Sequence, residues 1–218
     1  MSWPTAKPVV VELGSFWAYY SIWALRALGG RAILVEPDPA NLEVGRVNFS
    51  LNELEGTFVH AALGGDHGAH TRLVCESDGI EREVPVVTIP GLMDDQGLET
   101  IDLLLMDIQG AETDALTRSA PILRERRVRF LVVSTHHHSI SGDPMSHQRC
   151  LQMLVDAGAH IVAEHTVGES FSGDGLIAAS MDPRDRHLRV PVSYARYRDS
   201  LFGELEPDLA SAWREIGR

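Results

Sequence analysis

The hydrophobic and polar positions of the chain alternate between short apolar runs and amphipathic stretches. A short apolar run bounded by turn residues is typical of a buried strand. The run at 101–108 is apolar almost throughout, so we expect a central strand that is buried on both faces. Two further strands, at 160–167 and 174–180, follow with a Gly- and Ser-rich turn between them. The earlier runs that predict strands are Pro8–Leu13, Arg31–Glu36, Thr57–Leu63, Ile101–Ile108 and Val128–Thr135.

Helical patterns separate these strands. Residues 21–28 carry apolar side chains at helical spacing, and Gly29 with Gly30 is typical of a helix end. Asp38 has the chemistry of an N-cap, and Pro39 suits the first helical position. Spacings of four and three then predict the apolar face of the next helix. That face consists of Ala40, Val44, Val47, Leu51 and Leu54.

The order of the elements predicts the fold class. Helices at about 111–126 and 143–158 follow the fourth and fifth strands, and the segment 64–97 has the pattern of a small inserted hairpin. Strands that alternate with helices indicate an α/β fold with a doubly wound, mostly parallel sheet. The final hairpin predicts one antiparallel strand near the C-terminal edge. We expect one domain over residues 1–181, and a tail over 182–218 whose helix near 197–216 packs on that domain or on a partner subunit.

Composition and charge narrow the function. The chain has 218 residues, and 31 acidic against 19 basic side chains give a net charge of −12, which argues against nucleic acid and anionic membranes as partners. No apolar run approaches the ~18 residues that a membrane span needs. The first eight residues, MSWPTAKP, lack the apolar region of a signal peptide. Two cysteines, Cys75 and Cys150, make no disulfide framework and fit a reducing cytoplasm. We therefore expect a cytoplasmic protein that acts on a small molecule.

Candidate chemistry gathers where the predicted strands end, because ligands of such sheets bind beyond the carboxyl ends of the strands. Gly14 follows the first strand and lets the backbone approach a ligand. Glu36 ends the second strand, 22 positions later, where an acid accepts hydrogen bonds from ribose hydroxyls. The first turn is not G-x-G-x-x-G, which counts against an NAD-dependent oxidoreductase.

Four segments together resemble the FkbM family of S-adenosylmethionine-dependent methyltransferases: VVELGSFWAYYSIWAL, ILVEPDPANLEVGRVNFSLN, VHAALGG and IDLLLMDIQGAETDAL. The resemblance covers about residues 9–180. It implies a class I methyltransferase fold, Rossmann-like, with strand order 3-2-1-4-5-7-6, and S-adenosylmethionine as the cofactor. It also implies site residues: Glu12, Gly14 and Ser15 on the methionine side, Glu36 at the ribose, Pro37, Ala61 and Ala62 around the adenine, and Asp107 facing the sulfonium and the acceptor.

The chain departs from the family pattern in its first loop and in one motif. Phe16 and Ala18 stand where the family usually has Asn and a later Gly, and the D-x-E-G-x-E motif has Gln109 in place of its first Glu. The first strand begins at about residue 8, so we expect a site that is open or covered by the partner subunit of a homodimer. The aromatic residues of this region are expected to pack in the core and between helices: Phe16, Trp17, Tyr19, Tyr20 and Trp23. An alternative for Tyr19 or Tyr20 is contact with the cofactor.

Three consecutive histidines, His136, His137 and His138, directly follow the fifth strand and so belong to the same rim as Asp107. Histidine is a suitable general base for a hydroxyl acceptor near neutral pH, and an Asp can orient it. A second hypothesis is a divalent metal ion held by Asp107, His136, His138 and His165, although the spacing matches no zinc motif. A third is a polar loop that binds substrate or only supports the structure.

Two other groups of polar residues also need a role. The turn at 168–175 is either structural or closes over the substrate through Glu169, Ser172 or Asp174. The remaining histidines are expected to be structural: His60, His67, His70, His147, His160 and His187.

The sequence therefore predicts an S-adenosylmethionine-dependent O-methyltransferase that acts on a small-molecule hydroxyl, such as a sugar or a natural-product intermediate. In this prediction Asp107 and one of the three consecutive histidines position and deprotonate the acceptor, with or without a divalent ion. Two alternatives stay open: an NAD-dependent oxidoreductase on the same kind of sheet, and a non-enzymatic domain that binds a metal or a partner.

Overall fold

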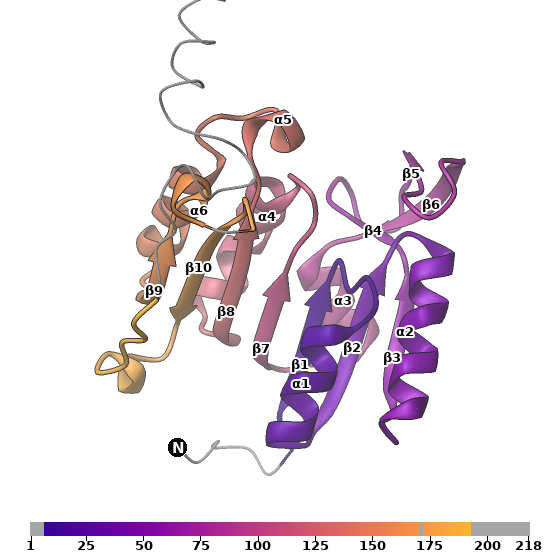
Figure 1. Cartoon of the computed structure of the whole chain (residues 1–218). Helices are drawn as coiled ribbons and strands as arrows, with labels where there is room; N and C mark the ends of the chain where they lie inside the picture. Colours follow the sequence, from indigo (N-terminus) through magenta and orange to yellow (C-terminus); the bar gives the residue numbers. More distant parts are fainter. Residues whose placement is uncertain (1–6, 171, 193–218) are drawn as a thin grey trace, which may run out of the picture.

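A seven-stranded sheet with helices on both faces forms the body of the molecule in the computed structural model, which describes residues 7–170 and 172–192 (Figure 1). The strand order is β3-β2-β1-β7-β8-β10-β9, the order that the resemblance implies. The predicted helix near 197–216 lies outside the described residues. The strands of this sheet are β1 (Val9–Leu13), β2 (Arg31–Glu36), β3 (Gly56–His60), β7 (Ile101–Met106), β8 (Val128–Thr135), β9 (His160–His165) and β10 (Gly175–Ser180).

One strand runs against the others. β10 pairs antiparallel with both β8 and β9, whereas β1, β2, β3, β7 and β8 pair parallel with one another. Gly175, the first residue of β10, therefore lies opposite Thr135, the last residue of β8. The start of β10 joins the edge at which the parallel strands end, so the residues that precede β10 lie at this edge too. This arrangement confirms the predicted α/β class and its single antiparallel strand.

Two hydrophobic cores lie between the sheet and its helices, one on each face of the sheet. The helices α1 (Tyr19–Leu28) and α2 (Pro39–Leu51) cover one face, where Ala24 and Phe49 pack on Val10 and Leu34. The opposite face carries the larger core, under α3 (Ile89–Asp95), α4 (Glu112–Arg124) and α6 (Ser146–Asp156). A short helix α5 (His138–Ser141) and two 3-10 turns, η1 (Val167–Glu169) and η2 (Pro183–Asp185), complete the described elements.

The predicted inserted hairpin is present. β5 (His70–Val74) and β6 (Glu81–Val87) pair antiparallel, and β4 (Ala62–Leu63) adds to β6 in parallel. The turn of the hairpin is fastened to the start of α2, because Ser77 donates hydrogen bonds from its backbone N and its Oγ to the carboxylate of the N-cap Asp38, both at 2.9 Å. The helix α3 in this segment was not predicted, although the Thr88 Oγ1 caps it by accepting from the Gly91 N.

The predicted apolar face of α2 is wrong over most of its length. Leu42, Gly45 and Phe49 pack inward, and Leu54 beyond the helix is half-buried. The Phe49 ring meets Phe58 edge to face at 5.2 Å between centroids, and Gly45 lets the helix approach Ala18 closely. A large ring and a residue without a side chain thus set the rotation of the helix. The predicted members left outside are Ala40, Val44, Val47 and Leu51, of which the last three are 40%, 49% and 77% exposed.

Two other packing predictions also need correction. The strand β7 is fully buried only toward the larger core, since Leu103 and Leu105 on the α1 side are half-buried. The aromatic residues expected to pack between helices are instead exposed at 42–70%: Phe16, Trp17, Tyr19, Tyr20 and Trp23. The α1 side of the molecule is therefore apolar and open to solvent.

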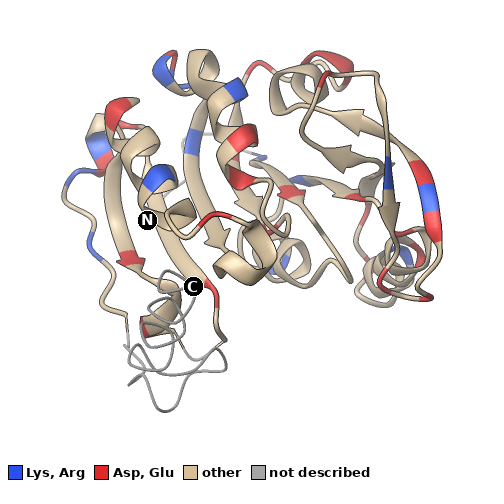
Figure 2. Ribbon diagram, turned by 90° about the horizontal axis from the view of Figure 1, so that it is seen from above, with Lys and Arg blue, Asp and Glu red and all other residues tan. Residues whose placement is uncertain are grey.

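The described surface carries charges of both signs. Seen from above, Lys and Arg positions are scattered among Asp and Glu positions along the described ribbon (Figure 2). None of the described helices is long and apolar enough to cross a membrane. Cys75 and Cys150 are buried free thiols.

The orientation of α2 can be tested by paired truncations. Phe49→Ala should lower the free energy of unfolding by about 3–5 kcal/mol, because it empties a ring-sized space in the smaller core. Leu51→Ala should lower it by less than about 0.5 kcal/mol, because that side chain is 77% exposed. Urea denaturation measures both values. Equal losses for the two variants would contradict this orientation.

Candidate active site

The site begins with a close backbone contact between β1 and β7. Gly14 has a φ of +72°, and a Cβ built on it would lie 1.8 Å from the Asp107 carbonyl oxygen. The Asp107 N donates to the Leu13 carbonyl at 2.9 Å. Any side chain at position 14 would therefore push the two strand ends apart. This contact fixes where Asp107 leaves the sheet.

Glu36, at the end of β2, organises the loop that follows β1. Its side chain is buried, with Oε2 accepting from the Phe16 N at 2.8 Å and Oε1 accepting from the Asp38 N at 3.0 Å. Burial raises the pKa of Glu36 against the opposing effect of these amides. Phe16 and Ala18 adopt left-handed φ angles of 43° and 65°, the conformation that a family glycine would adopt without strain. Each carboxylate oxygen still has a lone pair for a ligand hydroxyl.

Glu12 and Ser15 supply further buried polar groups beside this loop. The Glu12 Oε2 accepts from the Ser21 N at 3.0 Å, and burial raises the pKa of Glu12 to about 7. The hydroxyl of Ser15 is buried and has no hydrogen-bond partner among the described residues. A buried hydroxyl without a partner fits a polar ligand in the loop, since leaving it unpaired costs free energy.

The three residues expected around the adenine lie where β2 and β3 end. Ala61 and Ala62 are buried, and Pro37 is half-buried. The His60 Nε2 is 2.9 Å from the Pro37 carbonyl oxygen, which ties the two strand ends together. These residues form an apolar border next to Glu36.

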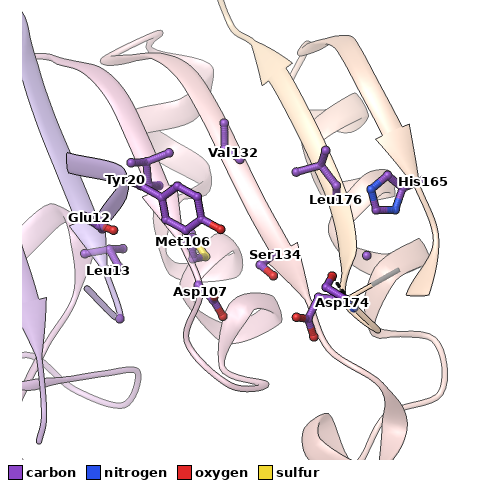
Figure 3. A pocket seen from close by; sticks show the side chains of 14 residues that line it. Glu12, Leu13, Tyr20, Met106, Asp107, Val132, Ser134, His165, Asp174 and Leu176 are labelled. Carbon is purple, nitrogen blue, oxygen red and sulfur yellow. Dashed lines mark hydrogen bonds between the residues drawn. The ribbon is translucent and has the colours of Figure 1, made fainter. Parts of the chain in front are cut away.

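A cavity of about 250 Å³ opens over the ends of β1, β7 and β8 and the start of β10 (Figure 3). Tyr20 from α1 lies across it, and Asp107 and Asp174 approach it from two different strands. Glu36, Pro37, Ala61 and Ala62 do not line it, so they form a separate part of the site. The lining residues are Glu12, Leu13, Gly14, Tyr20, Leu105, Met106, Asp107, Val132, Ser134, His165, Ser172, Asp174, Gly175 and Leu176.

His136 lies behind this cavity between two carboxylates. Its side chain is 1% exposed, with Nδ1 2.8 Å from the Glu112 Oε1 and Nε2 3.0 Å from the Asp107 Oδ1. Burial favours the neutral ring, but the two carboxylates outweigh it and raise the pKa of His136 to about 10. The ring is thus an imidazolium at neutral pH and cannot accept a proton there. Its position suits it to hold Asp107 rather than to act as the predicted base.

The other two consecutive histidines lie outside the cavity. His137 precedes α5 and caps it, with its Nδ1 accepting from the Ser139 N at 3.3 Å. His138 is exposed, and its ring centroid is 3.9 Å from that of His137. The helix α5 begins at His138, so the side chains no longer alternate in direction as they do along a strand. Contrary to the prediction, His138 does not point to the same side as His136.

The predicted metal site is not assembled. Within residues 7–170 and 172–192, no group of three or more His, Cys, Asp and Glu side chains is placed to hold a metal ion. Of the predicted ligands, His138 is exposed and both ring nitrogens of His136 face carboxylates. His165 does line the cavity, but its Nδ1 is 3.2 Å from the Thr166 carbonyl oxygen. The proposed set Asp107, His136, His138 and His165 was therefore a wrong prediction.

The comparisons with known proteins decide the family. A family model described as the methyltransferase FkbM domain matches residues 7–161. The chain belongs to the FkbM methyltransferase family. No curated protein matches it.

Solved structures agree with this FkbM methyltransferase in fold. The cofactor-bound Rv0187 from MTB aligns with a TM-score of 0.53 at 18% identity, over 79% of this chain and 72% of that one. The METTL16 methyltransferase domain aligns with a TM-score of 0.51 at 12% identity, over 82% of this chain and 61% of that one. The fold is that of class I methyltransferases.

The motif departure of this FkbM methyltransferase does not change the cavity. Gln109 is exposed with a left-handed φ of 53°, so a family Glu at this position would also face solvent. The motif's last residue, Glu112, is buried, and its Oε1 accepts from the Ile108 N at 3.3 Å and the Gly110 N at 3.1 Å. Glu112 thus closes the turn after β7 and holds His136 as well.

The sequence analysis missed Glu112, and it left Tyr20 and Asp174 undecided. The only sequence signal for Glu112 is its place as the last residue of the D-x-E-G-x-E motif, because an acid in the first turn of α4 can reach back to the strand end. The expectation that His147 is structural agrees with its place outside the cavity. Its Nδ1 lies 2.7 Å from the Thr135 Oγ1 and its Nε2 2.9 Å from the Glu164 Oε1.

The protonation of His136 should make stability depend on pH. The pKa of about 10 in the folded protein lies above the usual 6.5, so the folded state binds the proton more tightly. The stabilisation that His136 provides is complete below pH 6.5 and is lost as the pH rises toward 10. The difference in unfolding free energy between wild type and His136→Gln should therefore shrink over this range.

Urea denaturation at each pH unit from 6 to 10 measures this difference. His138→Gln is the control, because the exposed His138 should show little difference at any pH. If the difference in unfolding free energy between wild type and His136→Gln stays constant from pH 6 to 10, the charged ring is ruled out.

Proposed function

We propose that this protein is an S-adenosylmethionine-dependent O-methyltransferase whose acceptor is a hydroxyl of a small uncharged molecule, such as a sugar or a natural-product intermediate. The observation that carries the proposal is the position of Asp107. Its side chain is 39% exposed at the cavity, while its Oδ1 faces the protonated His136. A carboxylate held in this way has one oxygen available to a hydroxyl group.

The cofactor would lie along the ends of β1, β2 and β3. Glu36 would accept hydrogen bonds from the ribose hydroxyls, and Pro37, Ala61 and Ala62 would border the adenine. Glu12, Gly14 and Ser15 would hold the methionine part, which the unpaired Ser15 hydroxyl supports. The bound cofactor supplies an electrophilic methyl group on its sulfonium.

Asp107 would orient the acceptor and take its proton. The acceptor oxygen forms the new bond to the methyl carbon while its proton passes to the free oxygen of Asp107. Alignment of the two reacting atoms supplies much of the rate in such a displacement. His136 is a positioning residue in this scheme, because it touches Asp107 and not the acceptor.

The lining of the cavity supports a small uncharged acceptor. Among the residues that the structure describes, none that lines it is Lys or Arg, so a phosphate or carboxylate there would meet Asp107 and Asp174 without a compensating charge from them. Ser134 and Ser172 offer hydrogen bonds, and Val132 and Leu176 offer an apolar wall. A volume of about 250 Å³ suits a small molecule.

The two alternative functions gain no support. The family match favours methyl transfer over an NAD-dependent oxidoreductase, and a formed cavity beside Asp107 favours an enzyme over a binding domain. The homodimer and the cytoplasmic location stay predictions.

Cofactor binding can be tested without knowledge of the acceptor. Isothermal titration should show binding of S-adenosylhomocysteine to the wild type. Glu36→Gln should weaken it about tenfold, because the amide removes the charge that strengthens hydrogen bonds to the ribose. Glu43→Gln, a charge change on the exposed side of α2, should leave the affinity unchanged. Unchanged affinity in Glu36→Gln would contradict the ribose assignment.

The role of Asp107 can be tested by transfer of a radiolabelled methyl group to a panel of sugars and natural-product alcohols. Asp107→Asn should lower kcat about 100-fold or more on any acceptor found, because the amide cannot take the proton. Its affinity for S-adenosylhomocysteine should change less than about threefold. A kcat near that of the wild type would exclude Asp107 as the proton acceptor.

A further inference from the structure

Three of the groups that line the cavity are acidic. Glu12, Asp107 and Asp174 approach it from the ends of β1 and β7 and the start of β10 (Figure 3), and within residues 7–170 and 172–192 no Lys or Arg lines it. The nearby cation, His136, lies 2.8 Å from Glu112 and 3.0 Å from Asp107. Its positive charge is therefore balanced before Asp174 is considered, at 3.8 Å.

Asp174 is fixed by its backbone and not by its carboxylate. The Asp174 N donates to the Ser172 Oγ at 3.3 Å, and the Gly173 N donates to the Ser170 Oγ at 3.1 Å. Within the described part of the chain, no hydrogen bond reaches the Asp174 carboxylate, and its closest cationic atom is the His136 Nε2. The turn thus presents a carboxylate to the cavity.

The negative groups around the cavity repel one another. Burial and the charges of Asp107 and Glu112 raise the pKa of Asp174, with His136 opposing them. Burial also raises the pKa of Tyr20, with Asp107, Glu12 and Asp174 adding to the effect. A cation placed among these groups would relieve the repulsion, whereas a neutral ligand would not.

We propose that Asp174 adapts this cavity to the positive sulfonium of the cofactor, so that the protein binds S-adenosylmethionine more tightly than S-adenosylhomocysteine. The inference rests on the proposed function. Methyl transfer breaks the bond between sulfur and the methyl carbon, and the electron pair stays on sulfur. The cofactor thus loses its sulfonium charge in the reaction, and the cavity then holds the product less tightly than the substrate form.

Isothermal titration with three nucleosides tests the inference by binding alone. S-adenosylmethionine carries a sulfonium, sinefungin carries an ammonium in its place, and S-adenosylhomocysteine carries neither. The wild type should bind both cations about tenfold or more tightly than S-adenosylhomocysteine. Asp174→Asn should reduce this preference to below about threefold, mainly by lowering the affinity for the two cationic nucleosides.

A matched control separates the local charge from the net charge. Glu125→Gln removes an equal charge at the C-terminal end of α4, where the helix ends at the opposite edge of the sheet from the cavity, and should keep the full preference. Thermal melting checks that each variant is folded, and Asp174→Ser replaces Asp174→Asn if the latter is not.

The outcomes are distinct. Equal affinities of the wild type for all three nucleosides would overturn this inference and leave the proposed function intact. A preference that survives in the Asp174 variants would overturn the role of that residue. If none of the three nucleosides binds to the wild type, the proposed function fails as well.

Discussion

The backbone contact between Gly14 and the Asp107 carbonyl is the constraint on which the rest of the site depends. β1 and β7 are neighbours at the centre of the sheet, and their ends meet with no room for a side chain. The loop after β1 then turns toward Glu36, while the chain after β7 turns toward Glu112. This one backbone contact therefore positions both loops of the site, the loop that Glu36 holds and the turn that Glu112 holds.

The part of the site around Asp107 is held together by charge. A buried imidazolium would be costly alone, but here it lies between two carboxylates, those of Glu112 and Asp107, which offset its charge. The pair of contacts fixes the carboxylate that faces the cavity. The antiparallel direction of β10 matters equally, because it places Asp174 at the edge where the other strands end. A parallel last strand would have begun at the far side of the sheet.

Much of the fold follows from the sequence, because turn chemistry and buried strands are local signals. Asp38 and Pro39 predict the start of α2, and the hydrogen bond from the Ala40 N confirms that cap. The rotation of α2 was missed because Val44, Val47 and Leu51 are apolar at helical spacing, yet the fit of Phe49 and Gly45 to the sheet decides which face is buried. Hydrophobic periodicity cannot measure such a fit.

The site was predicted less completely for a similar reason. Strand ends are readable, so Glu12, Glu36 and Asp107 were found at the correct edge. The directions of His136, His137 and His138 depend on where α5 begins, and the protonation of His136 depends on Glu112 from another element. Both are tertiary effects that a linear pattern does not contain.

The open apolar side of the molecule affects how copies of it interact in solution. Tyr19 and Trp23 on α1 are 70% and 68% exposed, and Leu51 on α2 is exposed as well. At low ionic strength the net charge of −12 keeps copies apart. Salt shortens the reach of that repulsion to roughly 8–10 Å near 0.1 M, but it does not screen the attraction between apolar surfaces. Colloidal stability therefore falls as salt is added, the reverse of an assembly held by opposite charges.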